Sequence, residues 1–175
     1  MKKIEITVYK FDELTPEAQA KATEKFFDIN VNYEWWQYIF EDAKNIGLKI
    51  ESFDIDRGNY CKGKLINSLY EVCDAIIKEH GDQCETYKTA KDFQSQWDSL
   101  VVKYSDGVQT DRVAEDNEYE FDKEADELES DFLQSLSEDY RIILSKEYEY
   151  LTSYEAIIET IKCNEYDFLE NGEQY

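Results

Sequence analysis

Residues 118–150 read EYEFDKEADELESDFLQSLSEDYRIILSKEYEY. Apolar and aromatic side chains recur in this stretch every three or four positions, which is the spacing of the buried face of an amphipathic helix. The side chains that share this spacing are Phe121, Ala125, Leu128, Phe132, Leu136, Tyr140 and Ile143. The pattern predicts one long helix from about Glu118 to Tyr150, with this apolar stripe facing the rest of the protein.

Acidic residues are concentrated in the first part of this helix and in the segment before it. Residues 111–139 contain 13 carboxylates, beginning with Asp111, and only two bases, Arg112 and Lys123. If these residues are mostly helical, they span roughly 43 Å at about 1.5 Å per residue. The carboxylates then follow one another every ~3.3 Å, close to the ~3.4 Å between phosphates along one DNA strand. An anchored helix of this kind would display charge at the density of a nucleic acid.

The carboxylates of this stretch are the partner-binding residues that the sequence predicts. They are Glu115, Asp116, Glu118, Glu120, Asp122, Glu124, Asp126, Glu127, Glu129, Asp131, Glu138 and Asp139. Their expected partner is a basic protein surface, because opposite charges attract and steer two molecules together. The alternative interpretation is that the charge only keeps the protein soluble.

The chain has 175 residues and a net charge of −22, which is distributed unevenly. Residues 1–110 contain 20 acids and 14 bases, whereas residues 111–175 contain 21 acids and 5 bases. Such a chain repels phosphate and anionic lipid, so we expect no direct binding to nucleic acid or to a membrane surface. The hydrophobic fraction of 42% is typical of a chain that folds.

A small antiparallel sheet and several shorter helices are predicted for the rest of the chain. Alternating apolar residues indicate strands over 4–11, 48–55 and 60–66. Helical spacing and capping residues indicate helices over about 15–27, 32–45, 67–80, 85–103 and 153–162, and a strand-like segment follows at 166–169. The predicted fold class is α+β. Residues 1–105 would form an α+β core, and residues 106–175 an acidic helical region whose last strand returns to that core.

Particular residues predict the start and the inner face of the first two helices. Thr15 is expected to be the N-cap of the first, with Pro16 at its first helical position. In the second, Trp36 shares a helical face with Phe40. We therefore expect Trp36 in the core and Trp35 nearer the edge.

The sequence contains no recognisable set of catalytic or metal-binding residues. The single histidine, His80, precedes Gly81 at the end of a predicted helix, where a cation caps the helix favourably. Asp54 opens a stretch that resembles a calcium loop, but Asn59 and Leu65 stand where its glycine and closing glutamate belong. The cysteines, which lack the paired spacing of a zinc motif, are Cys61, Cys73, Cys84 and Cys163. We expect no catalytic residue, no metal and no cofactor, and a protein that acts by binding.

The opening residues 1–7 lack the apolar run of a signal peptide, and no stretch of about 18 apolar residues follows. We therefore expect the protein to work in the cytoplasm of the cell that makes it.

Short stretches near both ends and in the first half of the chain are distinctive. They are YKFDELTPEAQ at 9–19, DINV at 28–31, EWW at 34–36, GLKI at 47–50, DIDRGNYC at 54–61, IIE at 157–159, NEYDF at 164–168 and NG at 171–172. These stretches resemble a family of small bacteriophage and prophage proteins, whose members are often labelled antitoxins of toxin–antitoxin systems.

The resemblance implies a protein that acts in a bacterial host. A small acidic phage protein without a catalytic set is also similar in type to anti-CRISPR proteins, which often block the basic nucleic-acid channels of host nucleases. We therefore expect an anti-defence inhibitor whose acidic face mimics nucleic acid and binds a host nuclease, in first place a CRISPR effector. The alternative, which the family label implies, is an antitoxin that neutralises a basic toxin.

Overall fold

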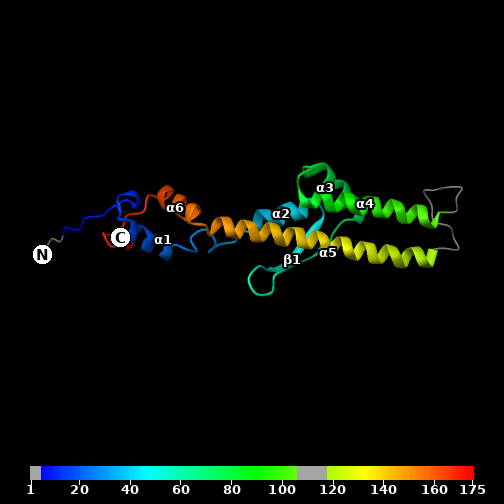
Figure 1. Cartoon of the computed structure of the whole chain (residues 1–175), viewed down its shortest axis with the longest axis horizontal. Coiled ribbons are helices and arrows are strands. Elements are labelled where there is room, and N and C mark those ends of the chain that lie inside the picture. Colours follow the sequence, from blue (N-terminus) through cyan, green and yellow to red (C-terminus); the bar gives the residue numbers. More distant parts are fainter. Residues whose placement is uncertain (1–4, 106–117) are drawn as a thin grey trace. The chain divides into compact units, whose positions relative to one another are not determined.

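The computed structural model describes residues 5–105 and 118–175 and confirms the α+β class (Figure 1). The described residues form six α-helices, one short 3-10 helix and one two-stranded antiparallel sheet. In chain order the elements are η1 (Phe11–Glu13), α1 (Pro16–Lys25), α2 (Gln37–Asn45), β1 (Leu48–Asp54), β2 (Tyr60–Leu65), α3 (Leu69–Glu79), α4 (Glu85–Tyr104), α5 (Glu118–Leu151) and α6 (Tyr154–Cys163).

The chain divides into two compact units. The terminal unit comprises Met1–Trp36 together with Ser145–Tyr175, and the central unit comprises Gln37–Leu144. The division that the sequence predicts, between residues 105 and 106, differs from the boundaries of these two units and stays a prediction.

The core of the terminal unit is formed by α1, α6 and the segments beside them. As predicted, Thr15 caps α1, because its hydroxyl accepts a hydrogen bond from the backbone N–H of Ala18, and Pro16 begins the helix. Gly172 lies against the Ala18 carbonyl with φ of +81°, where a side chain would clash. The buried residues of this core are Phe11, Leu14, Ala18, Ala22, Ile157, Ile161 and Phe168.

The strand predicted over residues 4–11 is wrong. Among the residues that are described there, only Tyr9 forms a β-bridge, through backbone hydrogen bonds with Phe168. Ile6 and Val8 are exposed, so their alternation does not mark a buried face. The chain bends into η1 at Phe11, which ends the pairing after one bridge. The strand-like segment at 166–169 likewise forms isolated bridges, from Phe168 to Tyr9 and to Gln174.

The prediction that Trp36 lies in the core is also wrong. The helix begins at Gln37 instead of Asn32, and turns occupy the residues just before it. The helical spacing that placed Trp36 inward therefore does not apply. Trp35 is buried and its ring lies 5.7 Å from that of Tyr148, whereas Trp36 is half-buried.

The central unit contains the hairpin of β1 and β2 that the sequence predicts. The strands are antiparallel, with Leu48 opposite Leu65 and Asp54 opposite Tyr60. The Asp54 carboxylate accepts hydrogen bonds from the backbone N–H groups of Asp56 and Arg57, which closes the turn. The stretch that resembles a calcium loop is therefore a hairpin turn.

A polar cluster ties four helices of the central unit together. The buried Tyr140 of α5 donates a hydrogen bond of 2.7 Å from its hydroxyl to Asp42 of α2. His80 lies at the C-cap position of α3, and its ring has Nε2 3.6 Å from Asp42 and Nδ1 2.7 Å from the hydroxyl of Thr86 in α4. The contact with His80 is the main cause that holds the pKa of Asp42 below its usual value, and the Tyr140 hydrogen bond adds to it.

We expect Trp35→Ala to lower the free energy of unfolding by about 3–5 kcal/mol, because it empties a buried aromatic site. Trp36→Ala is the matched control and should cost clearly less, since that ring is half-buried. Urea denaturation followed by circular dichroism measures both. A larger loss for Trp36→Ala would contradict the placement of the two rings.

The lowered pKa of Asp42 predicts how stability depends on pH. Its folded pKa lies below its unfolded value, so its ionised form stabilises the fold above about pH 4, and this contribution is lost as pH falls through the folded pKa. Asp42→Asn should therefore lower the free energy of unfolding by about 1 kcal/mol or less near neutral pH, since water screens this half-exposed carboxylate. This difference from the original protein should disappear in acid. The exposed Asp74→Asn is the control. A deficit that grows on acidification would refute this role.

Candidate functional site

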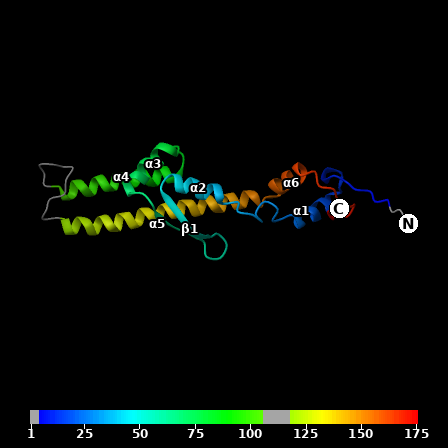
Figure 2. The same ribbon diagram turned by 180° about the vertical axis from the view of Figure 1, so that it is seen from behind.

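The acidic helix is held by an antiparallel pairing of α4 with the first part of α5, which lie side by side in both views (Figure 1, Figure 2). In the middle of the interface between the two helices, the ring centroids of Phe93 and Phe132 are 4.8 Å apart. Thr89, near the start of α4, donates a hydrogen bond of 2.7 Å to Asp139, and Tyr104, at the other end of α4, packs edge-on against Phe121. Contacts at both ends and in the middle thus fix the two helices against each other.

The apolar stripe of α5 is confirmed with one exception. Ala125, Phe132, Leu136 and Tyr140 are buried, and Phe121 and Leu128 are half-buried. The stripe continues to Leu144, which is fully buried, and not to Ile143, which is exposed. The reason is the helical period: residue 144 follows residue 140 by four positions and stays on its face, whereas residue 143 lies at the edge of that face.

Three of the predicted partner-binding carboxylates already have partners within the protein. Glu124 accepts hydrogen bonds of 2.7 Å from Lys103 and of 2.8 Å from the Tyr104 hydroxyl. Glu138 pairs with Arg141 at 2.7 Å, three residues further along α5. Asp139 is half-buried and bound by Thr89, and burial is the main cause that raises its pKa. Glu124 and Asp139 thus bind residues of α4, and Glu138 is paired within α5, so all three carboxylates already have partners.

Seven other predicted carboxylates are exposed and have no hydrogen bond or ion pair to any residue that the structure describes. Helical spacing sorts them into two rows. The groove row is Glu120, Glu127 and Asp131. The outer row is Glu118, Asp122, Asp126 and Glu129. The remaining predicted residues, Glu115 and Asp116, lie outside the described residues, as does Asp111.

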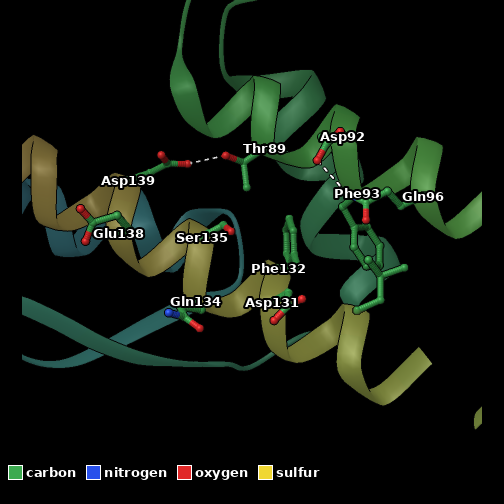
Figure 3. A pocket seen from close by; sticks show the side chains of 11 residues that line it. Thr89, Asp92, Phe93, Gln96, Asp131, Phe132, Gln134, Ser135, Glu138 and Asp139 are labelled. Carbon is green, nitrogen blue, oxygen red and sulfur yellow. Dashed lines mark hydrogen bonds between the residues drawn. The ribbon is translucent and has the colours of Figure 1, made fainter. Parts of the chain in front are cut away.

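A groove runs between α4 and α5 along the groove row. It consists of two cavities of about 540 and 610 Å³ that share Gln96, Leu128 and Asp131. Phe93 and Phe132 lie between the two helices at its floor (Figure 3). We call this feature the α4–α5 groove. None of the outer row lines either cavity.

The sequence does not predict that α4 contributes to this groove. Asp92, Gln96, Ser99 and Lys103 line it, and they follow one another at helical spacing on one face of α4. That spacing in the sequence indicates a polar face of α4. The sequence does not show, however, that this face of α4 lies beside the groove row of α5.

No protein-family model, no curated protein and no solved structure matched the chain in the comparisons that we made. In the part of the chain that the structure describes, no helix is both long enough and apolar enough to cross a membrane. Over the same residues, no three His, Cys, Asp or Glu side chains come together in an arrangement able to hold a metal ion.

The raised pKa of Asp139 predicts a stabilising substitution. Because its folded pKa lies above its unfolded value, the ionised carboxylate costs stability at neutral pH, and this cost vanishes as pH falls below the unfolded pKa. Asp139→Asn removes the charge while its carbonyl still accepts from Thr89, so unfolding by urea at pH 7 should need a higher concentration. The advantage should fade near pH 4.

The exposed, unpaired Asp131→Asn is the control for this experiment and should leave the urea midpoint unchanged. A lower midpoint for Asp139→Asn at pH 7 would show that the buried charge stabilises the fold.

Proposed function

We propose that this protein inhibits a nuclease of a bacterial host by occupying its basic nucleic-acid-binding groove with the acidic surface of α5. The observation that carries the proposal is the set of seven exposed carboxylates of α5 that have no partner among the described residues. In this proposal the protein acts by binding alone, without a catalytic residue, metal or cofactor of its own.

The unpaired state of these carboxylates is what makes them suitable for binding. A carboxylate that is already paired, such as Glu124, must give up its lysine before it can bind another cation. The seven side chains without a partner among the described residues have no such bond to give up. Between Glu118 and Asp131 they cover roughly 20 Å of helix axis, or about one charge per 3 Å. This density is close to the one phosphate per ~3.4 Å along a DNA strand.

The rigidity of α5 adds to the expected affinity. A disordered acidic tail loses conformational freedom when it binds, and that loss weakens the complex. Here the buried stripe of α5 and its contacts with α4 hold the helix that carries the carboxylates in place before binding. The backbone of this segment therefore does not have to become ordered in the complex.

The choice of a nuclease target comes from the resemblance to phage proteins and the similarity in type to anti-CRISPR inhibitors. A CRISPR effector is the first candidate, because it must expose a basic channel for its guide and its target. The net charge of −22 disfavours nucleic acid itself as the partner. The site of action in this proposal is the cytoplasm of the host cell.

The test replaces three unpaired acids of α5, one of them in the outer row. Glu120, Asp126 and Glu127 are changed together to Lys. The matched control changes three exposed acids of the terminal unit, Glu24, Asp28 and Glu159, and so alters the net charge by the same amount. Purified guide-loaded CRISPR effectors are mixed with fluorescent target DNA, and DNA binding is measured by anisotropy.

We expect the original protein and the control variant to displace DNA from an effector that the original protein inhibits. This displacement should weaken as the salt concentration rises, because salt screens exposed charge pairs. The α5 variant should need a concentration about tenfold higher or more. Equal inhibition by both variants would refute recognition through α5. The antitoxin alternative would be favoured by two results together: the original protein inhibits no effector, and it rescues cells from a basic toxin whereas the α5 variant does not.

A further inference from the structure

The α4–α5 groove has an apolar floor between acidic walls. Phe93, Leu100 and Phe132 are buried at its floor, and Leu128, which lines both cavities, is half-buried. The walls carry Asp92 from α4 and the groove row from α5. The cations that line the groove are Lys103, which is paired with Glu124, and Lys123. Carboxylates therefore dominate a channel whose centre is apolar.

The dimensions of the groove match a helix. It extends along α4 from Thr89 to Lys103, which is roughly 21 Å of helix axis or four turns. Two antiparallel helices leave a furrow along their seam, and a third helix is the element that commonly fills such a furrow. A helix with apolar side chains at every third or fourth position would cover Leu128 and bring its flanking residues to the acidic walls.

We propose that the α4–α5 groove receives a basic amphipathic helix of the partner protein, with arginines on the two flanks of its apolar stripe. This inference rests on the proposed function and deepens it, since it names the part of the nuclease that is bound. Arginine suits the walls better than lysine, because its planar guanidinium binds carboxylates through two hydrogen bonds and its stem packs on apolar surface. A second copy of this chain is disfavoured, since its net charge is also −22.

Gln96 gives the sharpest test, because it is exposed on α4 and lines both cavities beside Asp131. Gln96→Arg places a cation at the centre of the groove without touching the core. Gln94→Arg is the matched control: it makes the same change two residues away on the same helix, where Gln94 lines a separate cavity with Trp97. Each substitution disturbs one exposed side-chain hydrogen bond. Gln96 donates to Asp92, and Gln94 accepts from Lys91.

The probe is a fluorescent peptide of about 15 residues that forms a helix with a leucine stripe flanked by arginines. A scrambled peptide of identical composition, which has no stripe, serves as the second probe. Binding of both peptides to the full chain is measured by anisotropy at physiological salt, and helix formation by circular dichroism.

We expect the striped peptide to become helical and to bind the original protein and Gln94→Arg with similar affinity. Its affinity for Gln96→Arg should fall about tenfold. The scrambled peptide should bind more weakly and alike to all three proteins. Equal binding of the two peptides, or equal effects of the two substitutions, would overturn the helix-in-groove inference.

That failure is distinguishable from failure of the proposed function. One outcome is that Gln96→Arg does not change the affinity for the striped peptide, but the reversal of Glu120, Asp126 and Glu127 abolishes displacement of DNA from an effector. Inhibition is then by acidic mimicry without a helix in the groove. If that reversal has no effect on inhibition while Gln96→Arg lowers peptide affinity, the groove binds basic helices for another purpose.

Discussion

The packing of Phe132 and Tyr140 into the central unit determines how every other side chain of α5 is presented. A helix is rigid about its own axis, so burial of one stripe fixes the direction of all remaining positions. The contact of 4.8 Å between Phe93 and Phe132 sets this orientation against α4, and the hydrogen bond from Tyr140 to Asp42 sets it against α2. The two rows of exposed carboxylates are a consequence of these buried contacts.

The arrangement of charge on α5 is unfavourable for an isolated helix. Glu118, Asp122 and Asp126 follow one another at intervals of four, and such like-charged neighbours each cost about 0.2–0.5 kcal/mol. The aromatic seam with α4 offsets this cost, and the ion pair of Glu124 with Lys103 relieves the charge at one point. Solubility alone does not require that acids be placed so close together on one helix. A basic partner would relieve the same repulsion, as the proposed function requires.

The sequence predicts those features that depend on local spacing. The bounds of α5 follow from its apolar period, and the start of α1 follows from Thr15 and Pro16, because caps and periodicity act over a few residues. The sequence does not predict which carboxylates of α5 are unpaired. Glu124 is bound by residues of α4 and Asp139 by Thr89, fifty positions earlier, so their pairing depends on tertiary structure. The burial of Trp36 is not predicted correctly for a related reason: its spacing predicts a core position only if the helix begins near residue 32, and turns precede Gln37 instead.

The most direct test of the central claim, that α5 is the recognition surface, is hydrogen–deuterium exchange of the protein alone and in complex with an effector nuclease that it inhibits. If α5 is the recognition surface, added protection should concentrate in peptides covering residues 118–132 of α5 and 92–104 of α4, with little change over α1 and α6. Protection confined to the terminal unit, with α5 unchanged in the complex, would contradict it and would place recognition away from the acidic helix.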